Sequence, residues 1–229
     1  MSDNFPCFSA NSLKFYRNLS CNNNRQWFSE HRSEYVNHVQ SPARQLAEKL
    51  GPMVAELDPR IETEPHRIIS RINRDTRFSN DKSPYRPRTF LAFHRSVERW
   101  SETPTFFFQV EETRYLFGMG IYGAPPAMMR RFRSLIDDDP ETFYSVVEPI
   151  LRNRSMALES DKYKRPFPAE FPETISAKII PWYQSKTIGV LGYRQPDKTL
   201  FSPKLADFLI DRFVLLKPLY DFLWKCTVL

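Results

Sequence analysis

The chain has 229 residues, and 33 Lys and Arg against 27 Asp and Glu give it a formal net charge of +6. Its 19 Phe, 10 Tyr and 4 Trp make it too aromatic for a disordered chain, and its 6 Gly leave little material for glycine-rich phosphate loops. Its length is compatible with one large domain or two small ones, and either can bury a core without disulfides or metals.

The sequence shows no sign of secretion or membrane insertion. The N-terminus lacks a basic segment followed by an apolar stretch, and no apolar run approaches the roughly 20 residues of a membrane-spanning helix. Cys7, Cys21 and Cys226 have no metal-type spacing, and an odd number of cysteines argues against a disulfide framework. We therefore expect a soluble, cytoplasmic protein with no membrane partner and no metal site. The sequence identifies no cofactor and no oligomeric state.

Helical periodicity dominates the N-terminal part. Apolar residues recur at spacings of three and four, and Asn24 is a suitable N-cap for the second of these segments. Ser41–Pro42 either kinks that helix or ends it and begins the next, because proline suits a first helical turn. The expected helices cover residues 13–19, 27–39 and 42–57.

The middle of the chain has the pattern of short strands. The expected strands are His66–Arg74, Thr89–Arg95, Thr105–Glu111 and Arg114–Tyr122. The last two are separated by a tight turn at Glu112–Thr113, which predicts an antiparallel hairpin. Strands that follow one another without helices between them argue against a parallel, doubly wound sheet.

Helices return in the C-terminal part. Pro125–Pro126, Asp139–Pro140 and Ser202–Pro203 are each typical of a helix start. The Pro-rich, aromatic segment Lys162–Pro181 is expected to be an ordered connector. The predicted fold is therefore α+β, with a central antiparallel sheet flanked by N-terminal and C-terminal helices, in a single domain over residues 1–229.

Most of the net charge lies in one window, Arg67–Arg88. This window has seven basic residues and two acidic ones, Asp75 and Asp81, so it carries +5 of the total of +6. The concentration of charge in one short segment creates a local positive field, which favours an anionic ligand. Planar guanidinium groups bind oxyanions through paired hydrogen bonds, whereas lysine supplies a point charge.

We therefore expect a binding or catalytic pocket for a small anionic ligand, phosphorylated or carboxylated. Asp75 is the candidate catalytic residue, which orients the arginines or acts as a general base. The basic side chains would bind the anion, a tyrosine hydroxyl would assist them, and three residues of the N-terminal part would form one wall. The candidate ligand-binding residues are Arg71, Arg74, Arg77, Lys82, Tyr85, Asn24, Arg25 and Trp27.

Two alternatives remain open. A basic isoelectric point near 9.2 and abundant aromatic residues are compatible with a nucleic-acid-binding module. That alternative is less favoured because only one short window is basic and Asp75 and Asp81 within it would repel phosphates. In the other alternative, interleaved arginines and aspartates form a buried ion-pair network that holds the loop and binds nothing.

Two motifs resemble one known family. The segments 22–28 (NNNRQWF) and 71–85 (RINRDTRFSNDKSPY) are similar to the signatures of domain-of-unknown-function family 2461. The similarity continues through the strand at Phe117–Tyr122 and the helix start at Ser202–Pro203. Family members usually have bulky residues at Ser70 and Asn73, so the chain departs from the pattern there. The resemblance implies no activity, substrate or cofactor.

Other chemical motifs have structural explanations. Gly118–Gly123 matches GxGxxG, but a dinucleotide site requires a parallel βαβ unit. We expect Gly118 and Gly120 to permit close approach of a neighbouring group instead. The acidic run Asp137–Asp139 is expected to cap a helix, and the four histidines lack the spacing of metal ligands.

Overall fold

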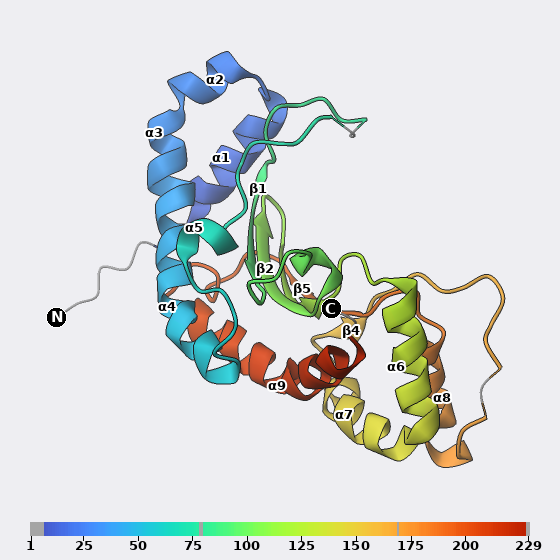
Figure 1. The fold of residues 1–229 in the computed structure, drawn as a ribbon. Coiled ribbons are helices and arrows are strands. Elements are labelled where there is room, and N and C mark those ends of the chain that lie inside the picture. The colour runs from blue at the N-terminus through green and yellow to red at the C-terminus, as the bar shows by residue number, and fades with distance from the viewer. Residues whose placement is uncertain (1–6, 78–79, 169, 228–229) are drawn as a thin grey trace. The chain divides into compact units, whose positions relative to one another are not determined.

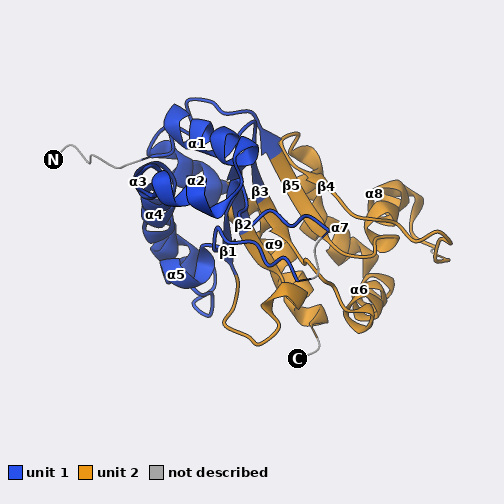
Figure 2. Cartoon of the chain, turned by 90° about the horizontal axis from the view of Figure 1, so that it is seen from above, with its two compact units in different colours: residues 1–93, 107–117, 193–211 blue, residues 94–106, 118–192, 212–229 orange. Residues whose placement is uncertain are grey.

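The computed structural model describes residues 7–77, 80–168 and 170–227. These residues divide into two compact units, which are coloured separately in Figure 2 and described separately here. Of the described residues, those within 1–93, 107–117 and 193–211 form unit 1, and those within 94–106, 118–192 and 212–229 form unit 2. The organisation of residues 1–229 as a single domain stays a prediction.

The fold class is α+β, as predicted (Figure 1). The strands form a five-stranded antiparallel sheet with the order β1-β2-β3-β5-β4. The expected hairpin is present, because β2 and β3 are neighbours on either side of the turn at Glu112–Thr113. The strands are β1 (Arg88–Phe93), β2 (Thr105–Glu111), β3 (Tyr115–Gly120), β4 (Ala157–Leu158) and β5 (Gly189–Arg194).

Helices come before β1 and after β5, as expected, but others lie between strands in the sequence. Those before β1 are α1 (Ala10–Cys21), α2 (Arg25–Glu30), α3 (Arg32–Tyr35), the π-helix η1 (Val36–Gln40), α4 (Ser41–Leu57) and α5 (Pro65–Ile68). The later ones are the 3₁₀-helix η2 (Trp100–Glu102), α6 (Pro126–Asp138), α7 (Pro140–Arg152), α8 (Glu173–Tyr183) and α9 (Lys204–Cys226). Of these, η2, α6, α7 and α8 lie between strands.

In unit 1, the N-terminal helices pack beside β1. Helix α1 buries Phe15, Tyr16 and Leu19, and both α4 and α5 contact β1. The π-helix η1 joins α3 to α4 without a break, so the chain runs helically from α3 into α4 (Figure 1). Pro42 lies in the first turn of α4, where its missing N–H costs no hydrogen bond.

The predicted strand His66–Arg74 is wrong. Pro65 begins the short helix α5, which includes His66, and the chain then forms isolated antiparallel bridges at Ile69 and Asn73. A proline at a first helical position favours the helical turn, which is why the segment begins as a helix. After the helix, Ile69 bridges to Leu91 of β1 and Asn73 bridges to Tyr85, outside the named strands.

In unit 2, aromatic side chains from the four helices α6, α7, α8 and α9 pack together in the core. The ring centroids of Phe132 and Phe143 are 5.4 Å apart, Phe143 and Trp182 are 6.0 Å apart, and Phe132 and Phe222 are 5.9 Å apart. Trp182 belongs to α8, which begins within the segment Lys162–Pro181 that we expected to be an ordered connector. The C-terminal half of this segment is helical and contributes to the core.

The two glycines of the GxGxxG segment allow β3 and β5 to approach closely, as expected. A Cβ atom on Gly118 would lie 2.0 Å from the carbonyl oxygen of Val190, and one on Gly120 would lie 3.0 Å from that of Ile188. The capping role of the acidic run is also confirmed, because the Asp139 side chain accepts a hydrogen bond from the N–H of Thr142. Strand β5 was not expected from the sequence.

Candidate functional site

The second motif forms a loop whose ends are held together. We call residues 74–84 the motif loop; positions 78 and 79 are outside the described residues. An antiparallel bridge joins Asn73 to Tyr85, and the N–H of Arg74 donates to the carbonyl of Pro84 at 2.8 Å. The base of the motif loop is therefore a short two-stranded ribbon.

The first motif holds this base. The Asn23 side chain donates from Nδ2 to the carbonyl of Tyr85 at 2.9 Å and accepts at Oδ1 from the N–H of Tyr85 at 3.0 Å. Phe28 of α2 stacks on the Tyr85 ring, with the centroids 4.2 Å apart. The two motifs thus meet in unit 1, and Tyr85, predicted to bind ligand, is buried in this contact.

The other predicted wall residues serve the N-terminal helices. Asn24 caps α2 by accepting a hydrogen bond from the N–H of Trp27 at 2.9 Å. The Trp27 ring stacks on His31, with the centroids 4.1 Å apart. Arg25 is exposed in the first turn of α2. The printed contacts of these side chains therefore explain helix capping and packing, and their role in a ligand site stays a prediction.

In the motif loop, Asp75 and Arg77 form a two-pronged ion pair at the surface. The Arg77 Nε atom lies 3.0 Å from Asp75 Oδ1, and its Nη2 atom lies 2.7 Å from Oδ2. Hydrogen bonds from Arg77 lower the pKa of Asp75 to about 2. Such a carboxylate is a weak base at neutral pH, so this geometry favours holding the loop over abstracting a proton. The catalytic role of Asp75 stays a prediction.

The remaining predicted cations of the motif loop also have partners within it. Arg74 pairs with Asp81, with Nη2 3.0 Å from Oδ2. Lys82 donates from Nζ to the carbonyl of Thr76 at 2.8 Å. Asp81 and Lys82 are exposed, whereas Arg74 is half-buried and its Nε atom is buried without a hydrogen-bond partner among the described residues.

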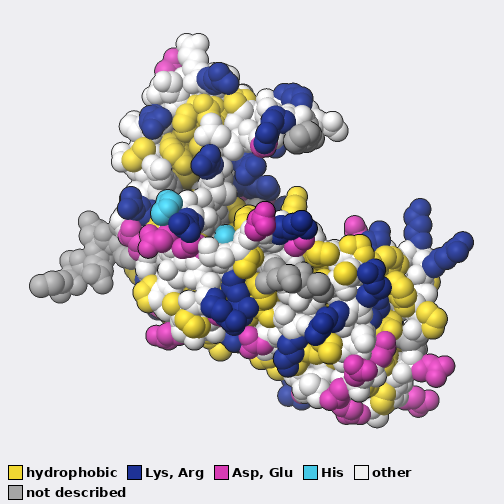
Figure 3. Space-filling model, in the orientation of Figure 1, with side chains coloured by type: hydrophobic (Ala, Val, Ile, Leu, Met, Phe, Trp, Pro, Cys, Tyr) yellow, Lys and Arg dark blue, Asp and Glu magenta, His cyan; other side chains and the backbone are white. Residues whose placement is uncertain are grey.

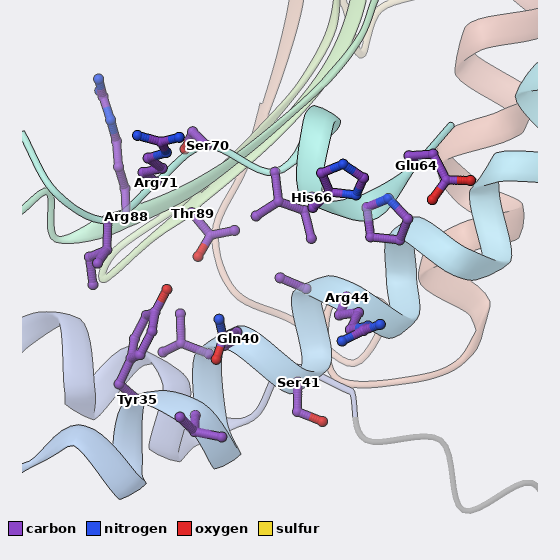
Figure 4. Close-up of a pocket in the computed structure, with 16 residues that line it drawn as sticks. Tyr35, Gln40, Ser41, Arg44, Glu64, His66, Ser70, Arg71, Arg88 and Thr89 are labelled. Atoms are coloured by element: carbon purple, nitrogen blue, oxygen red, sulfur yellow. The ribbon is translucent and has the colours of Figure 1, made fainter. Parts of the chain in front are cut away.

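A pocket lies beside the motif loop, between helices and strand β1 of unit 1. Its volume is about 540 Å³, which is within the range of small-molecule sites. It is lined by α3, η1 and the start of α4 on one side, and by α5, the segment after it and the start of β1 on the other (Figure 4).

The pocket has an excess of positive charge. Arg71 and Arg88 lie at one end of the lining, and His66, Glu64 and Arg44 lie at the other (Figure 4). Arg44 pairs with Glu48 one turn along α4, with Nε 3.0 Å from Oε1. Within the described part of the chain, the guanidinium groups of Arg71 and Arg88 have no hydrogen-bonding or ionic partner.

The pocket also offers hydroxyl groups and apolar surface. Thr89, the second residue of β1, is only 5% exposed, and its hydroxyl accepts a hydrogen bond from Tyr16 at 2.7 Å. Tyr35 extends its hydroxyl into the same region (Figure 4). Apolar side chains complete the lining, namely Val36, Val39, Ala43, Pro65, Ile69 and Ile72.

Of the predicted site residues, all of which the structure describes, only Arg71 lines this pocket. Arg88 belongs to the basic window that the sequence identified, but its place on the lining depends on where β1 begins. Tyr35, Arg44 and Thr89 carried no signal as site residues. They come from helix and strand positions that meet only in the folded unit.

Other kinds of site find no support among the described residues. No group of three or more His, Cys, Asp or Glu side chains is placed to hold a metal ion within residues 7–77, 80–168 and 170–227. In the same part of the chain, no helix has both the length and the apolar character needed to cross a membrane.

The fold and the site define an α+β protein with a cation-lined pocket in its N-terminal unit. A family model described as "Conserved hypothetical protein (DUF2461)" matches residues 11–222. The chain belongs to this family, as its two motifs predicted. No curated protein matches the sequence.

Proposed function

We propose that the unit 1 pocket binds a small molecule that carries a carboxylate or phosphate group. The observation that carries this proposal is the pair of arginines, Arg71 and Arg88, which line the pocket and have no partner within the described residues. A guanidinium group presents its donors in a planar fork that matches an oxyanion. Two such forks at one end of a pocket supply the positive field that the sequence places in this window.

The rest of the lining supports a ligand with an apolar body. Val39, Ala43 and Ile72 are buried around the pocket, and small-molecule sites combine such apolar walls with a few polar groups that set orientation. A volume of about 540 Å³ accommodates an aromatic or aliphatic ring in addition to the anionic group. Aromatic carboxylates and aryl phosphates therefore fit the pocket better than bare inorganic ions.

Calorimetric titration with phenyl phosphate and with benzoate tests this proposal. We expect the wild-type protein to bind at least one of them and Arg71→Ala to weaken binding about 10- to 100-fold, since a hydrogen bond to a charged group contributes roughly 1.5–3 kcal/mol. Arg77→Ala is the matched control, because Arg77 comes from the same motif but is bonded to Asp75. Its affinity should stay within about twofold of wild type.

Two results would contradict this proposal. If neither compound binds, or if Arg71→Ala and Arg77→Ala weaken binding equally, the pocket is not the anion site. Thermal-shift measurements on both variants show whether each remains folded.

The nucleic-acid alternative has a weaker basis. On the face shown in Figure 3, Lys and Arg side chains are interspersed with Asp and Glu rather than joined in one basic surface. Proteins that follow a phosphate backbone need a continuous basic track. Binding to a fluorescent single-stranded RNA at several salt concentrations separates the two functions, since affinity for a phosphate backbone falls steeply with salt.

A further inference from the structure

We infer that Thr89 is the innermost anion-binding hydroxyl of the pocket and that Tyr16 is a positioning residue that directs it toward the ligand. This inference rests on the proposed function and deepens it, because it states which form of the ligand the inner wall recognises. Neither residue belongs to the two sequence motifs. Both come from the ordered core of unit 1, from α1 and β1.

Tyr16 lies in a buried environment. Its side chain is 0% exposed, and burial raises the pKa of its hydroxyl, so that the group stays protonated at neutral pH. A buried hydroxyl proton without an acceptor is costly. The one acceptor that the described residues offer this proton is the Thr89 hydroxyl oxygen, 2.7 Å away.

The hydrogen bond from Tyr16 limits where the proton of the Thr89 hydroxyl can point. A threonine hydroxyl has one donor and two lone pairs, and the bond from Tyr16 occupies one lone pair. If Thr89 donated to Tyr16 instead, the buried Tyr16 proton would lose its acceptor. Thr89 must therefore aim its own proton elsewhere, and its side chain is part of the pocket wall (Figure 4). The inner wall thus presents a fixed hydroxyl donor.

Tyr35 supplies a second hydroxyl donor on the same side of the pocket as Thr89. Tyr35 is half-buried, its hydroxyl lies on the same side of the pocket as Thr89 in Figure 4, and that hydroxyl has no hydrogen-bond partner among the described residues. Burial raises the pKa of Tyr35, which keeps it a donor. Two hydroxyl donors, in a pocket that Arg71 and Arg88 also line, favour an ionised oxyanion, which only accepts hydrogen bonds. They select against an ammonium group at that position, because it has donors and no acceptor.

A double-mutant cycle with phenyl phosphate as the probe tests this arrangement. Thr89→Val keeps the shape of the side chain but removes the hydroxyl, and we expect it to weaken binding about tenfold, the value of one hydrogen bond to a charged group. We expect Tyr16→Phe to weaken binding about threefold, because Thr89 loses its orientation. The double variant should match Thr89→Val alone, since coupled residues act non-additively.

Tyr115→Phe is the matched control. Tyr115 also lies in the core of unit 1, and its hydroxyl donates to Asp197 at 3.2 Å, away from the pocket lining. Its loss should lower stability and leave the affinity for phenyl phosphate unchanged. The double variant Tyr16→Phe with Thr89→Val removes both partners of one buried hydrogen bond, so it leaves no unsatisfied group and should remain folded.

The outcomes separate this inference from the proposed function. If the wild-type protein binds neither phenyl phosphate nor benzoate, the proposed function fails and this inference fails with it. If the wild type binds phenyl phosphate and Thr89→Val binds equally well, this inference alone is wrong. Additive effects in the double variant, or a loss of affinity in Tyr115→Phe equal to that in Tyr16→Phe, would overturn the positioning role of Tyr16.

Discussion

Four arginines of the basic window fall into two groups that the sequence does not distinguish. In the motif loop, Arg74 and Arg77 are bonded to aspartates only a few residues away. On the pocket lining, Arg71 and Arg88 have no such partner within the described residues. The number of positive charges in a segment therefore does not locate a binding site. What matters is which guanidinium groups line a pocket and which are paired with a carboxylate after folding.

The boundary between the two groups is the base of the motif loop. Asn23 binds the backbone of Tyr85 through both atoms of its amide group, and Phe28 covers the Tyr85 ring. The chain then continues to Arg88 at the start of β1, on the pocket lining. The first motif thus has a structural task in this protein, which is to fix where the loop ends and the pocket wall begins.

The largest expected effect comes from removing this boundary. Asn23→Ala leaves the N–H and carbonyl of Tyr85 without their two partners, and we expect a loss of about 2 kcal/mol in the free energy of unfolding. Urea denaturation measures it. Asn22→Ala is the control, because Asn22 is exposed and the one hydrogen bond of its side chain among the described residues goes to the carbonyl of Asn18 in its own helix. Equal losses in both variants would show that the amide of Asn23 does not hold the loop base.

Replacing arginine by lysine should have a smaller effect, and it should affect only the arginines on the pocket lining, where the geometry of the guanidinium group matters. Arg71→Lys and Arg88→Lys keep the positive charge but remove the planar fork, and we expect each to weaken phenyl phosphate binding about fivefold. Arg77→Lys should leave the affinity unchanged. Calorimetric titration measures all three. If lysine replaces arginine on the pocket lining without loss, the pocket supplies only a positive field and no directed hydrogen bonds.

The sequence predicted the fold better than the site. The α+β class, the hairpin of β2 and β3, the cap at Asn24 and the roles of Gly118 and Gly120 followed from local rules of capping, turns and backbone approach. The strand predicted at His66–Arg74 failed, because a four-residue helix and two single bridges are too short to produce a periodic pattern.

The pocket escaped prediction for a different reason. Tyr35 and Arg44 lie on either side of η1, a π-helix with a wider turn than an α-helix, so a period of 3.6 residues does not show that both line one pocket. Thr89 looks like an ordinary strand residue, and its significance comes from Tyr16, which is far away in the sequence. Only Arg71 could be identified, because its charge lies in the motif itself.

The smallest expected effect concerns the ion pair of the motif loop. Hydrogen bonds from Arg77 hold the pKa of Asp75 near 2, below its ordinary value of 3.8. A depressed pKa in the folded state means that the pair stabilises the fold above the ordinary value and that this contribution is lost as the pH falls from about 4 through about 2. Because both side chains are exposed, the change in melting temperature should be slight.

The titration of the Asp75 carboxyl carbon, followed by NMR, is therefore the more sensitive measurement of this pair. The wild-type midpoint should lie near 2, and Arg77→Ala should move it back toward 3.8. Arg71→Ala is the control, because Arg71 lines the pocket and makes no contact with Asp75 among the described residues. If Arg71→Ala shifts the Asp75 midpoint as much as Arg77→Ala does, the pocket and the motif loop share one electrostatic site, and the division of the arginines into two groups is wrong.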